Sequence, residues 1–235
     1  MRWRVAGRLV AGAVVLGLLA FGFRELVSAR GFQLFGDLTE RVETSEKVVA
    51  LTFDDGPHPA STAEVLDVLR EKRVPGTFFL IGRDLAAHPE LGRRIAGEGH
   101  EIGNHTYSHE RMVFVTPGFV AGEIERTDSL IRATGFRGEI TVRPPHGKKF
   151  LALPHYLAEH HRRTITWDVE PNSSAAVDAD PARIVEHVVR HVRPGSIVLL
   201  HPHYPSGRNS RDSLGPMIDR LRDQGYRFTT VSGLG

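Results

Sequence analysis

The sequence contains no cysteine. Disulfide bonds and thiolate metal ligands are therefore excluded. The absence is compatible with an oxidising compartment, although it does not demonstrate one. Aromatic residues are also sparse, at 8% of the chain, whereas 40% of the residues are hydrophobic and 25% are charged. That balance is typical of a globular protein and too apolar for a disordered one.

The chain also lacks a basic surface, despite a sequence pI of about 9.1. Residues 1–30 contain five arginines and one glutamate, a net charge of +4, and the whole chain carries +2, so residues 31–235 carry −2. Nucleic-acid-binding domains show their basic character across the folded domain. The positive charge here belongs to the N-terminus, and we expect no nucleic-acid partner.

The N-terminal apolar stretch Leu9–Phe23 is only fifteen residues long, which is short for a membrane-spanning helix and close to the core of a signal peptide. Small residues at 27–29 offer a cleavage site. Arg24 could instead extend its charge towards water, so that residues 9–27 act as a retained anchor in the cytoplasmic (inner) membrane. A buried amphipathic helix is disfavoured because the stretch is apolar on every face. We therefore predict a signal peptide or signal anchor at residues 1–30 and an exported, periplasmic or extracytoplasmic protein.

Beyond a predicted linker at residues 31–46, short apolar runs alternate with helical patterns. A chain of this length buries one core well and is short for two enzyme domains, so we predict one catalytic domain at residues 47–235. The predicted strands, rich in β-branched and aromatic residues, are 48–53, 77–81, 100–103, 140–142, 164–169, 196–200 and 227–231. Prolines, glycines and capping residues delimit roughly six helices between them. The alternation predicts an α/β fold with about seven parallel strands, in a barrel or an open sheet.

Polar residues capable of catalysis follow the carboxyl ends of several predicted strands. They are Asp54 and Asp55 after the first strand, His105 and His109 after the third, Arg143 after the fourth and His201 after the sixth. Active sites of parallel α/β folds assemble at that edge of the sheet. We therefore expect these side chains to meet in one site.

The segment TFDDGP at residues 52–57 places two carboxylates side by side. A turn would explain the dipeptide alone, but two like charges so close raise one pKa unless a cation lies near them. A divalent metal would bind one carboxylate and leave the other free as a base. His105 and His109 can face the same way on one turn of helix and supply further ligands, although Thr106 stands where the zincin motif has its glutamate. One Asp with two His leaves positions open for water and substrate, which suits hydrolysis.

Two further residues have candidate roles in this site. His201 could act as a general acid towards a leaving amine. Its place directly after a strand favours it over His203, which follows two residues later. Arg143 could hold a carboxylate by a bidentate contact, although, taken alone, a surface arginine before the Pro-Pro turn is the better explanation.

Taken in order, these segments resemble the five motifs of the polysaccharide deacetylase family, also called the NodB-homology domain. The matching segments are TFDDGPHP (52–59), HTYSH (105–109), RPPHG (143–147), ITWDVEP (165–171) and IVLLHPH (197–203). The resemblance runs from about Lys47 to the C-terminus. It implies a distorted (β/α) barrel, usually with seven strands, and a hydrolase acting on N-acetylated sugars.

The resemblance also implies roles for the acidic and basic residues of the first three motifs. Asp54 would be the base that activates a metal-bound water, and Arg143 would orient it. Asp55, His105 and His109 would be the metal ligands. The metal of this family is usually Zn²⁺ and sometimes Co²⁺ or another divalent ion.

The remaining motifs carry the acid and the substrate contacts, with two departures from the family pattern. His201 would protonate the departing amine, the backbone amide near His146 would help hold the oxyanion, and Trp167 would contact the substrate. His146 occupies a position that is usually Tyr. The fourth motif commonly adds an Asp-Trp pair that supports the catalytic histidine, and this chain has Ser173 and Ser174 there. Loss of that carboxylate is expected to weaken the histidine's orientation and lower its pKa.

Three functions are consistent with these residues. The first is a deacetylase that removes N-acetyl groups from amino sugars of an envelope or extracellular polysaccharide. The second is the same chemistry on a formyl or acyl amide of a lipid-linked sugar or another small molecule, in line with the altered fourth motif. The third is a catalytically weak carbohydrate-binding protein, which the intact TFDDGP and HxxxH segments disfavour.

Overall fold

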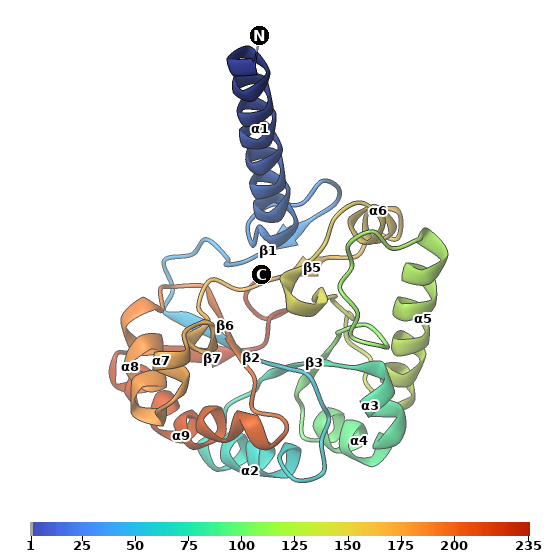
Figure 1. The fold of residues 1–235 in the computed structure, drawn as a ribbon. Helices are drawn as coiled ribbons and strands as arrows, with labels where there is room; N and C mark the ends of the chain where they lie inside the picture. The colour runs from blue at the N-terminus through green and yellow to red at the C-terminus, as the bar shows by residue number, and fades with distance from the viewer. Residues whose placement is uncertain (1) are drawn as a thin grey trace.

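The computed structural model describes residues 2–235, with side chains from residue 12 onward. In this range the chain forms α-helices arranged around a mainly parallel sheet (Figure 1). The helices are α1 (Arg2–Ser28), α2 (Thr62–Lys72), α3 (Gly82–Ala87), α4 (Pro89–Gly97), α5 (Pro117–Ala133), α6 (Ala152–Glu159), α7 (Ala175–Asp178), α8 (Pro181–His191) and α9 (Arg208–Asp223). The strands are β1 (Leu38–Thr39), β2 (Val48–Asp54), β3 (Thr77–Leu80), β4 (Glu101–Asn104), β5 (Thr164–Ile165), β6 (Ser196–Leu200) and β7 (Arg227–Thr229).

A five-stranded parallel sheet forms the centre of the fold. Its order is β4–β3–β2–β6, and β7 pairs with β2 as well. Every residue of β2, β3, β4 and β6 is buried, because helices and loops cover both faces of the sheet. Six of the seven predicted strands are found at the expected places, so the α/β prediction from the sequence is confirmed.

The fourth predicted strand is reduced to a single bridging residue, Val142, which pairs in parallel with β4 on one side and with β5 on the other. The fifth predicted strand is regular only over Thr164–Ile165, and Val169 then bridges to Val198 of β6. Single bridges thus connect the two ends of the sheet in place of continuous ladders. The strand segments follow one another as in a distorted (β/α) barrel whose hydrogen-bonded ladder is not closed.

Helices α2, α8 and α9 cover one side of the sheet, as Figure 1 shows. Leu66 of α2, Ile184 of α8 and Met217 of α9 are fully buried in the same apolar cluster as Leu51 and Phe53 of β2. Burying one such side chain contributes about 1.5–3 kcal/mol relative to leaving it exposed. This packing fixes the carboxyl end of β2, where Asp54 lies.

The first residues of α5 and α2 show whether the N-terminal caps predicted from the sequence form. Thr116 caps α5 by accepting a hydrogen bond from the backbone N–H of Phe119, with Pro117 in the first helical position, as the sequence predicts. Ser61 and Glu64 have the spacing of a capping box before α2, which the sequence predicts, but the hydroxyl of Ser61 has no hydrogen-bond partner and the prediction is wrong. The hydroxyl of Thr62 instead accepts a hydrogen bond from the backbone N–H of His58 at 2.8 Å.

Helix α1 projects away from the domain, and only its last turns pack against it (Figure 1). Val27 is 6% exposed, and its carbonyl accepts a hydrogen bond from the backbone N–H of Lys149. The segment predicted as a linker, 31–46, lies along the domain and contributes β1, which pairs in parallel with β5. Within residues 12–235, whose side chains the structure describes, no helix is long and apolar enough to cross a membrane.

Candidate active site

The carboxyl ends of β2, β4 and β6 surround a pocket of about 440 Å³. Seven of the eight site residues predicted from the sequence line it, namely Asp54, Asp55, His105, His109, His146, Trp167 and His201. The eighth, Arg143, lies directly behind the pocket and contacts Asp54. The expectation that these side chains converge at one edge of the sheet is met.

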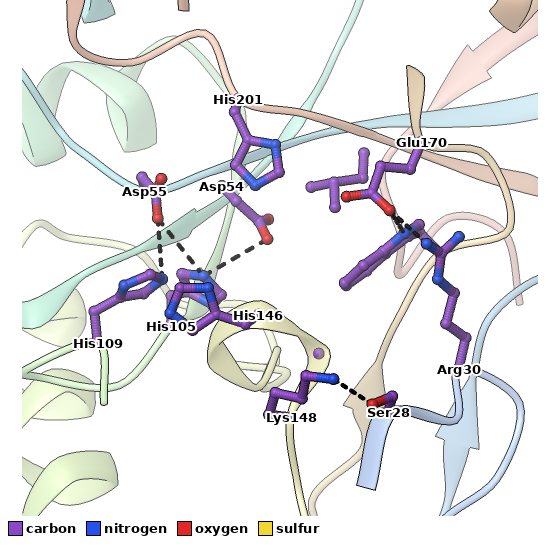
Figure 2. A pocket seen from close by; sticks show the side chains of 13 residues that line it. Ser28, Arg30, Asp54, Asp55, His105, His109, His146, Lys148, Glu170 and His201 are labelled. Carbon is purple, nitrogen blue, oxygen red and sulfur yellow. Dashed lines mark hydrogen bonds and ion pairs between the residues drawn. The ribbon is translucent and has the colours of Figure 1, made fainter. Parts of the chain in front are cut away.

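Asp55, His105 and His109 form a group that could hold a divalent ion. One ligand atom from each lies within 4.8 Å of the others, and Figure 2 shows the three side chains turned towards one another. The Oδ1 atom of Asp55 is 3.3 Å from Nε2 of His109 and 3.8 Å from Nε2 of His105. The same Oδ1 is buried without a hydrogen-bond partner. A buried carboxylate oxygen left unpaired is costly unless a cation binds it, so the residues fit a metal ion.

The Nδ1 atom of His105 is 2.7 Å from the backbone carbonyl of Arg143. A carbonyl only accepts, so Nδ1 carries the proton and Nε2 presents its lone pair to the group. Most metal-binding histidines in proteins are oriented in this way, by a hydrogen bond from the ring nitrogen that does not bind the metal. Burial lowers the pKa of His105 and brings the pKa of His109 to about 4, with the neighbouring His146 as a second cause for His109. Both imidazoles are therefore neutral near pH 7, the form that binds metals.

The expectation that His105 and His109 share a turn of helix is wrong. The two residues lie in a loop after β4, and both Thr106 and His109 have a left-handed backbone, with φ of 63°. Such a conformation is unfavourable for residues other than glycine and persists only where surrounding contacts impose it. Thr106 supplies two of them, because its N–H donates to Asn104 and its hydroxyl accepts from the N–H of His109.

A glutamate from α5, which sequence reasoning missed, holds this loop from behind. The Oε2 atom of Glu123 accepts hydrogen bonds from the backbone N–H of Tyr107 and from the N–H and hydroxyl of Ser108. Glu123 is 7% exposed. Hydrogen bonds from N–H groups to a buried charge are stronger than those between neutral groups. No local pattern in the α5 sequence separates Glu123 from Glu125, the other glutamate of that helix.

Replacing Glu123 with glutamine is expected to weaken binding of a divalent metal ion at this group by about 10–100-fold, as is usual when support behind metal ligands is lost. The amide keeps the shape of the side chain but loses the charge that three donors share. Glu125→Gln on the same helix is the matched control, because Glu125 is exposed and contacts only the hydroxyl of Tyr156. Calorimetric titration of zinc into the metal-free proteins measures the effect. Equal affinity in the two variants would contradict this role.

Asp54 is almost fully buried and is held by Arg143. Its Oδ1 accepts a hydrogen bond from Nη1 of Arg143 at 2.6 Å, while its Oδ2 lies 3.6 Å from Nε2 of His105. Burial raises the pKa of Asp54, but the charge of Arg143 and the nearby imidazoles outweigh it and hold the pKa below its ordinary value. The carboxylate is therefore ionised at neutral pH with one oxygen free to face the pocket.

Arg143 is fully buried, so the alternative of a surface arginine is wrong. The expected bidentate contact is also absent, since a single nitrogen contacts Asp54. The guanidinium donates instead to the hydroxyl of Thr52 and the carbonyls of Ile165 and Thr166, and it lies 4.0 Å from the ring centroid of Phe79. These hydrogen bonds hold the guanidinium between β2 and the end of β5 and thereby fix the orientation of Asp54.

The structure separates the two histidines that follow β6. His201 lines the pocket beside Asp54, whereas His203 is 2% exposed behind it. The ring of His203 packs against Gly56, where an added Cβ would come within 2.8 Å of the imidazole. No carboxylate among residues 12–235 lies within 4 Å of the His201 ring nitrogens, in keeping with the loss expected from Ser173 and Ser174.

Burial lowers the pKa of His203 to about 3. An imidazole that is neutral when folded and has an ordinary pKa of 6.5 when unfolded stabilises the fold fully above pH 6.5, and this stability is lost as the pH falls towards 3. Each pH unit in that window costs up to about 1.4 kcal/mol. His203→Gln is expected to lose stability less steeply than the wild type between pH 6.5 and 4 in urea unfolding. His160→Gln, at an exposed site, should follow the wild type, and identical slopes for all three proteins would refute the assignment.

The wall opposite the metal group contains residues that the sequence did not predict for the site. Glu170 accepts hydrogen bonds from Nη2 of Arg30 at 2.5 Å and from Nε1 of Trp167 at 3.0 Å (Figure 2). Lys148 donates to the hydroxyl of Ser28, and both line the pocket. Arg30 and Ser28 come from the segment predicted as a signal peptide or anchor. Their position arises from the packing of the end of α1, for which the sequence carries no local signal.

The turn at Pro145–Gly147 forms a third part of the wall, and His146 adopts a left-handed backbone there, with φ of 55°. The N–H groups of Gly147 and Lys148 bond to carbonyls within this turn. The N–H of His146 takes no part in those bonds. Trp167 is 5% exposed and lies next to Gly147, so its ring is packed into the wall of the pocket with little of its surface open to solvent.

A family model described as "Polysaccharide deacetylase" matches residues 41–165. The peptidoglycan-N-acetylmuramic acid deacetylase PdaC of Bacillus subtilis is 35% identical over 83% of this chain, which spans only 40% of that protein's length. A chitooligosaccharide deacetylase of Bradyrhizobium sp. is 38% identical over 77% of this chain and 87% of its own length. The structure of the Bc1960 peptidoglycan N-acetylglucosamine deacetylase aligns with a TM-score of 0.78 and 31% identity, over 84% of this chain and 92% of the other. The chain belongs to the polysaccharide deacetylase family.

Proposed function

We propose that this protein is a metal-dependent hydrolase that removes N-acetyl groups from amino sugars of an envelope or extracellular polysaccharide. The observation that carries the proposal is the group of Asp55, His105 and His109 beside the buried carboxylate of Asp54 in one open pocket. Relatives that act on peptidoglycan and on chitooligosaccharides support this substrate class. We propose zinc as the metal, because two imidazoles and one carboxylate with an open position suit catalytic zinc.

A divalent cation at this group would polarise the amide carbonyl and lower the pKa of the attacking water. Asp54 accepts the proton of that water at Oδ2, since Oδ1 is occupied by Arg143. The N–H of His146 donates to the carbonyl oxygen as negative charge develops on it. His201 donates a proton to the amine nitrogen as the C–N bond breaks, and Trp167 forms part of the wall for the sugar.

The contacts between the end of α1 and the pocket support a proposal for the protein's location. We propose that the protein is exported and that α1 is retained as a signal anchor. Cleavage at residues 27–29 would remove the carbonyl of Val27 that binds the N–H of Lys149 and the hydroxyl of Ser28 that binds Lys148. Both contacts support a wall of the pocket. N-terminal sequencing of the protein from membrane fractions tests the point, and a mature chain beginning near Arg30 would contradict it.

A lipid-linked amino sugar or a smaller amide remains a second candidate substrate. The observation in its favour is that the pocket is rimmed by Ser28 and Arg30, at the end of the apolar helix. A third candidate, a carbohydrate-binding protein with weak catalysis, is favoured by the lack of any carboxylate within 4 Å of the His201 ring nitrogens among the side chains that the structure describes.

The test uses the full chain in detergent, stripped of metal and then supplied with zinc. Acetate release is measured from N-acetylglucosamine oligomers, from peptidoglycan and from a lipid-linked N-acetylated sugar. Zinc-dependent release from the first two substrates supports the polysaccharide deacetylase. Release from the lipid-linked sugar alone favours the second candidate, and sugar binding without release at saturating zinc favours the third.

A further inference from the structure

The exposed large apolar side chains of this protein are gathered at one end. Those on α1 are Val14, Val15, Leu16, Leu18, Leu19 and Phe21, each at least 55% exposed. The others lie in three segments near the end of α1, and we call five of them the collar: Phe32, Leu34, Phe35, Phe114 and Leu151. Phe119, next to the collar on α5, is 38% exposed. Among residues 12–235, no large apolar side chain is exposed to this degree elsewhere.

The collar is attached to the last turns of α1. The ring of Phe23 stacks on Phe114 at 5.2 Å and meets Phe150 edge-on at 5.1 Å. Phe35, Phe114 and Leu151 line one apolar hollow of about 430 Å³. Phe114 is 80% exposed. An exposed aromatic patch of this kind marks a surface that meets an apolar partner.

The length of the apolar part of α1 indicates which partner that is. The fifteen residues of Leu9–Phe23 extend about 22 Å along a helix axis. The hydrocarbon core of a bilayer is about 30 Å thick, which leaves about 8 Å unfilled. Such a mismatch is relieved when further apolar protein surface enters the boundary between headgroups and acyl chains, or when the bilayer becomes locally thinner. The collar lies beside the end of α1, where Phe23 stacks on Phe114, so it supplies apolar surface at that depth.

Charge around the same point fits lipid headgroups. Arg24 lies one residue beyond the apolar run and is exposed. Lys148 follows at the rim of the pocket, bonded to the hydroxyl of Ser28, while the charge of Arg30 at the same rim is paired with Glu170. Cations placed next to an apolar belt are attracted to anionic headgroups, at about 1 kcal/mol per charge near the surface.

We propose that the collar and the end of α1 dock on the outer lipid surface of the membrane, so that the active-site pocket opens at headgroup level. The inference rests on the retention of α1 under the proposed function and adds the orientation of the domain. Ser28 joins the two features, since it ends α1 and lines the pocket. A glycan strand or sugar is then processed where it meets the membrane surface, and the collar holds the pocket there.

The absence of cysteine allows a direct test with one introduced cysteine at a time. Three exposed glycines have open space where a side chain would start: Gly17 in α1, Gly118 beside the collar and Gly97 in α4 at the opposite end of the domain. The variants G17C, G118C and G97C are labelled with an environment-sensitive fluorophore and reconstituted as full chains in vesicles of phosphatidylethanolamine and phosphatidylglycerol. Lipids carrying a quencher at the headgroup or deep in the acyl chain then report the depth of each label.

We expect headgroup quenchers to reduce the emission of the Gly118 label at least threefold more than that of the Gly97 label, and deep quenchers to act on the Gly17 label. Adding Phe114→Ser to G118C should remove most of its quenching and leave the Gly17 signal unchanged. A quenched Gly17 label with equal emission at Gly118 and Gly97 would overturn the docking. If the Gly17 label is not quenched either, both the docking and the membrane anchor are overturned. The catalytic proposal is tested separately, by acetate release in detergent.

Discussion

Replacing Asp54 with asparagine is expected to lower zinc-dependent acetate release by about 10²–10⁴-fold, the usual contribution of a general base. The amide cannot accept the proton of the attacking water, yet it has nearly the shape of the carboxylate. Asp54 is not among the three residues that form the metal group. Zinc affinity should therefore stay within a few-fold of the wild type, which separates loss of the base from loss of the metal.

The matched control for this variant is Asp223→Asn, at an exposed carboxylate at the end of α9. It should retain full activity. Wild-type rates in Asp54→Asn at saturating zinc would eliminate Asp54 as the base. A variant that no longer binds zinc would show that Asp54 acts on the metal group instead.

Replacing Arg143 with methionine is expected to destabilise the protein by about 3–5 kcal/mol, since it leaves the buried carboxylate of Asp54 without its partner. The pKa of Asp54 is held below its ordinary value by Arg143 against the effect of burial. In the wild type this carboxylate stabilises the fold above about pH 3.8, and the stability is lost as the pH falls through the lowered pKa. Without Arg143, burial raises the pKa, so the base becomes protonated at higher pH.

The same variant should therefore move the acid limb of the pH–rate profile to higher pH, an effect that a purely structural role would not produce. Arg143→Lys is the second variant and is used if the methionine variant fails to fold. It keeps a positive charge near Asp54, so it should shift the acid limb less than the loss of the charge would. Urea unfolding measures stability and initial rates of acetate release measure the profile. An unshifted acid limb in a folded variant would rule out Arg143 as the residue that positions and ionises Asp54.

Much of the fold could be predicted because its strands are buried on both faces and so appear as continuous apolar runs. Residues 48–53 and 196–200 are examples, and each run ends directly before a residue of the site, Asp54 or His201. The bridging residue Val142 shows the limit of this signal. Of the three β-branched residues 140–142, only Val142 pairs with neighbouring strands. Where the chain leaves the sheet depends on tertiary contacts, which this short run does not encode.

The site could be predicted where its residues sit at strand ends and not where packing brings distant segments together. Asp54 and His201 follow this rule, and burial of His203 settles the choice between the two histidines. The prediction that His105 and His109 lie on one turn of helix was wrong because a spacing of four residues also fits a loop, here one held by a buried carboxylate. That carboxylate, Glu123, is contributed by a helix more than ten residues further along the chain.

The most direct test of the account is a zinc titration of the metal-free full chain, with bound zinc and acetate release from N-acetylglucosamine oligomers and peptidoglycan measured in the same samples. We predict that activity rises in proportion to zinc and saturates at one ion per chain, and that His109→Ala, which removes one of the three ligands, abolishes both signals. Zinc bound at one ion per chain without acetate release from either substrate would contradict the assignment of this site to polysaccharide deacetylation.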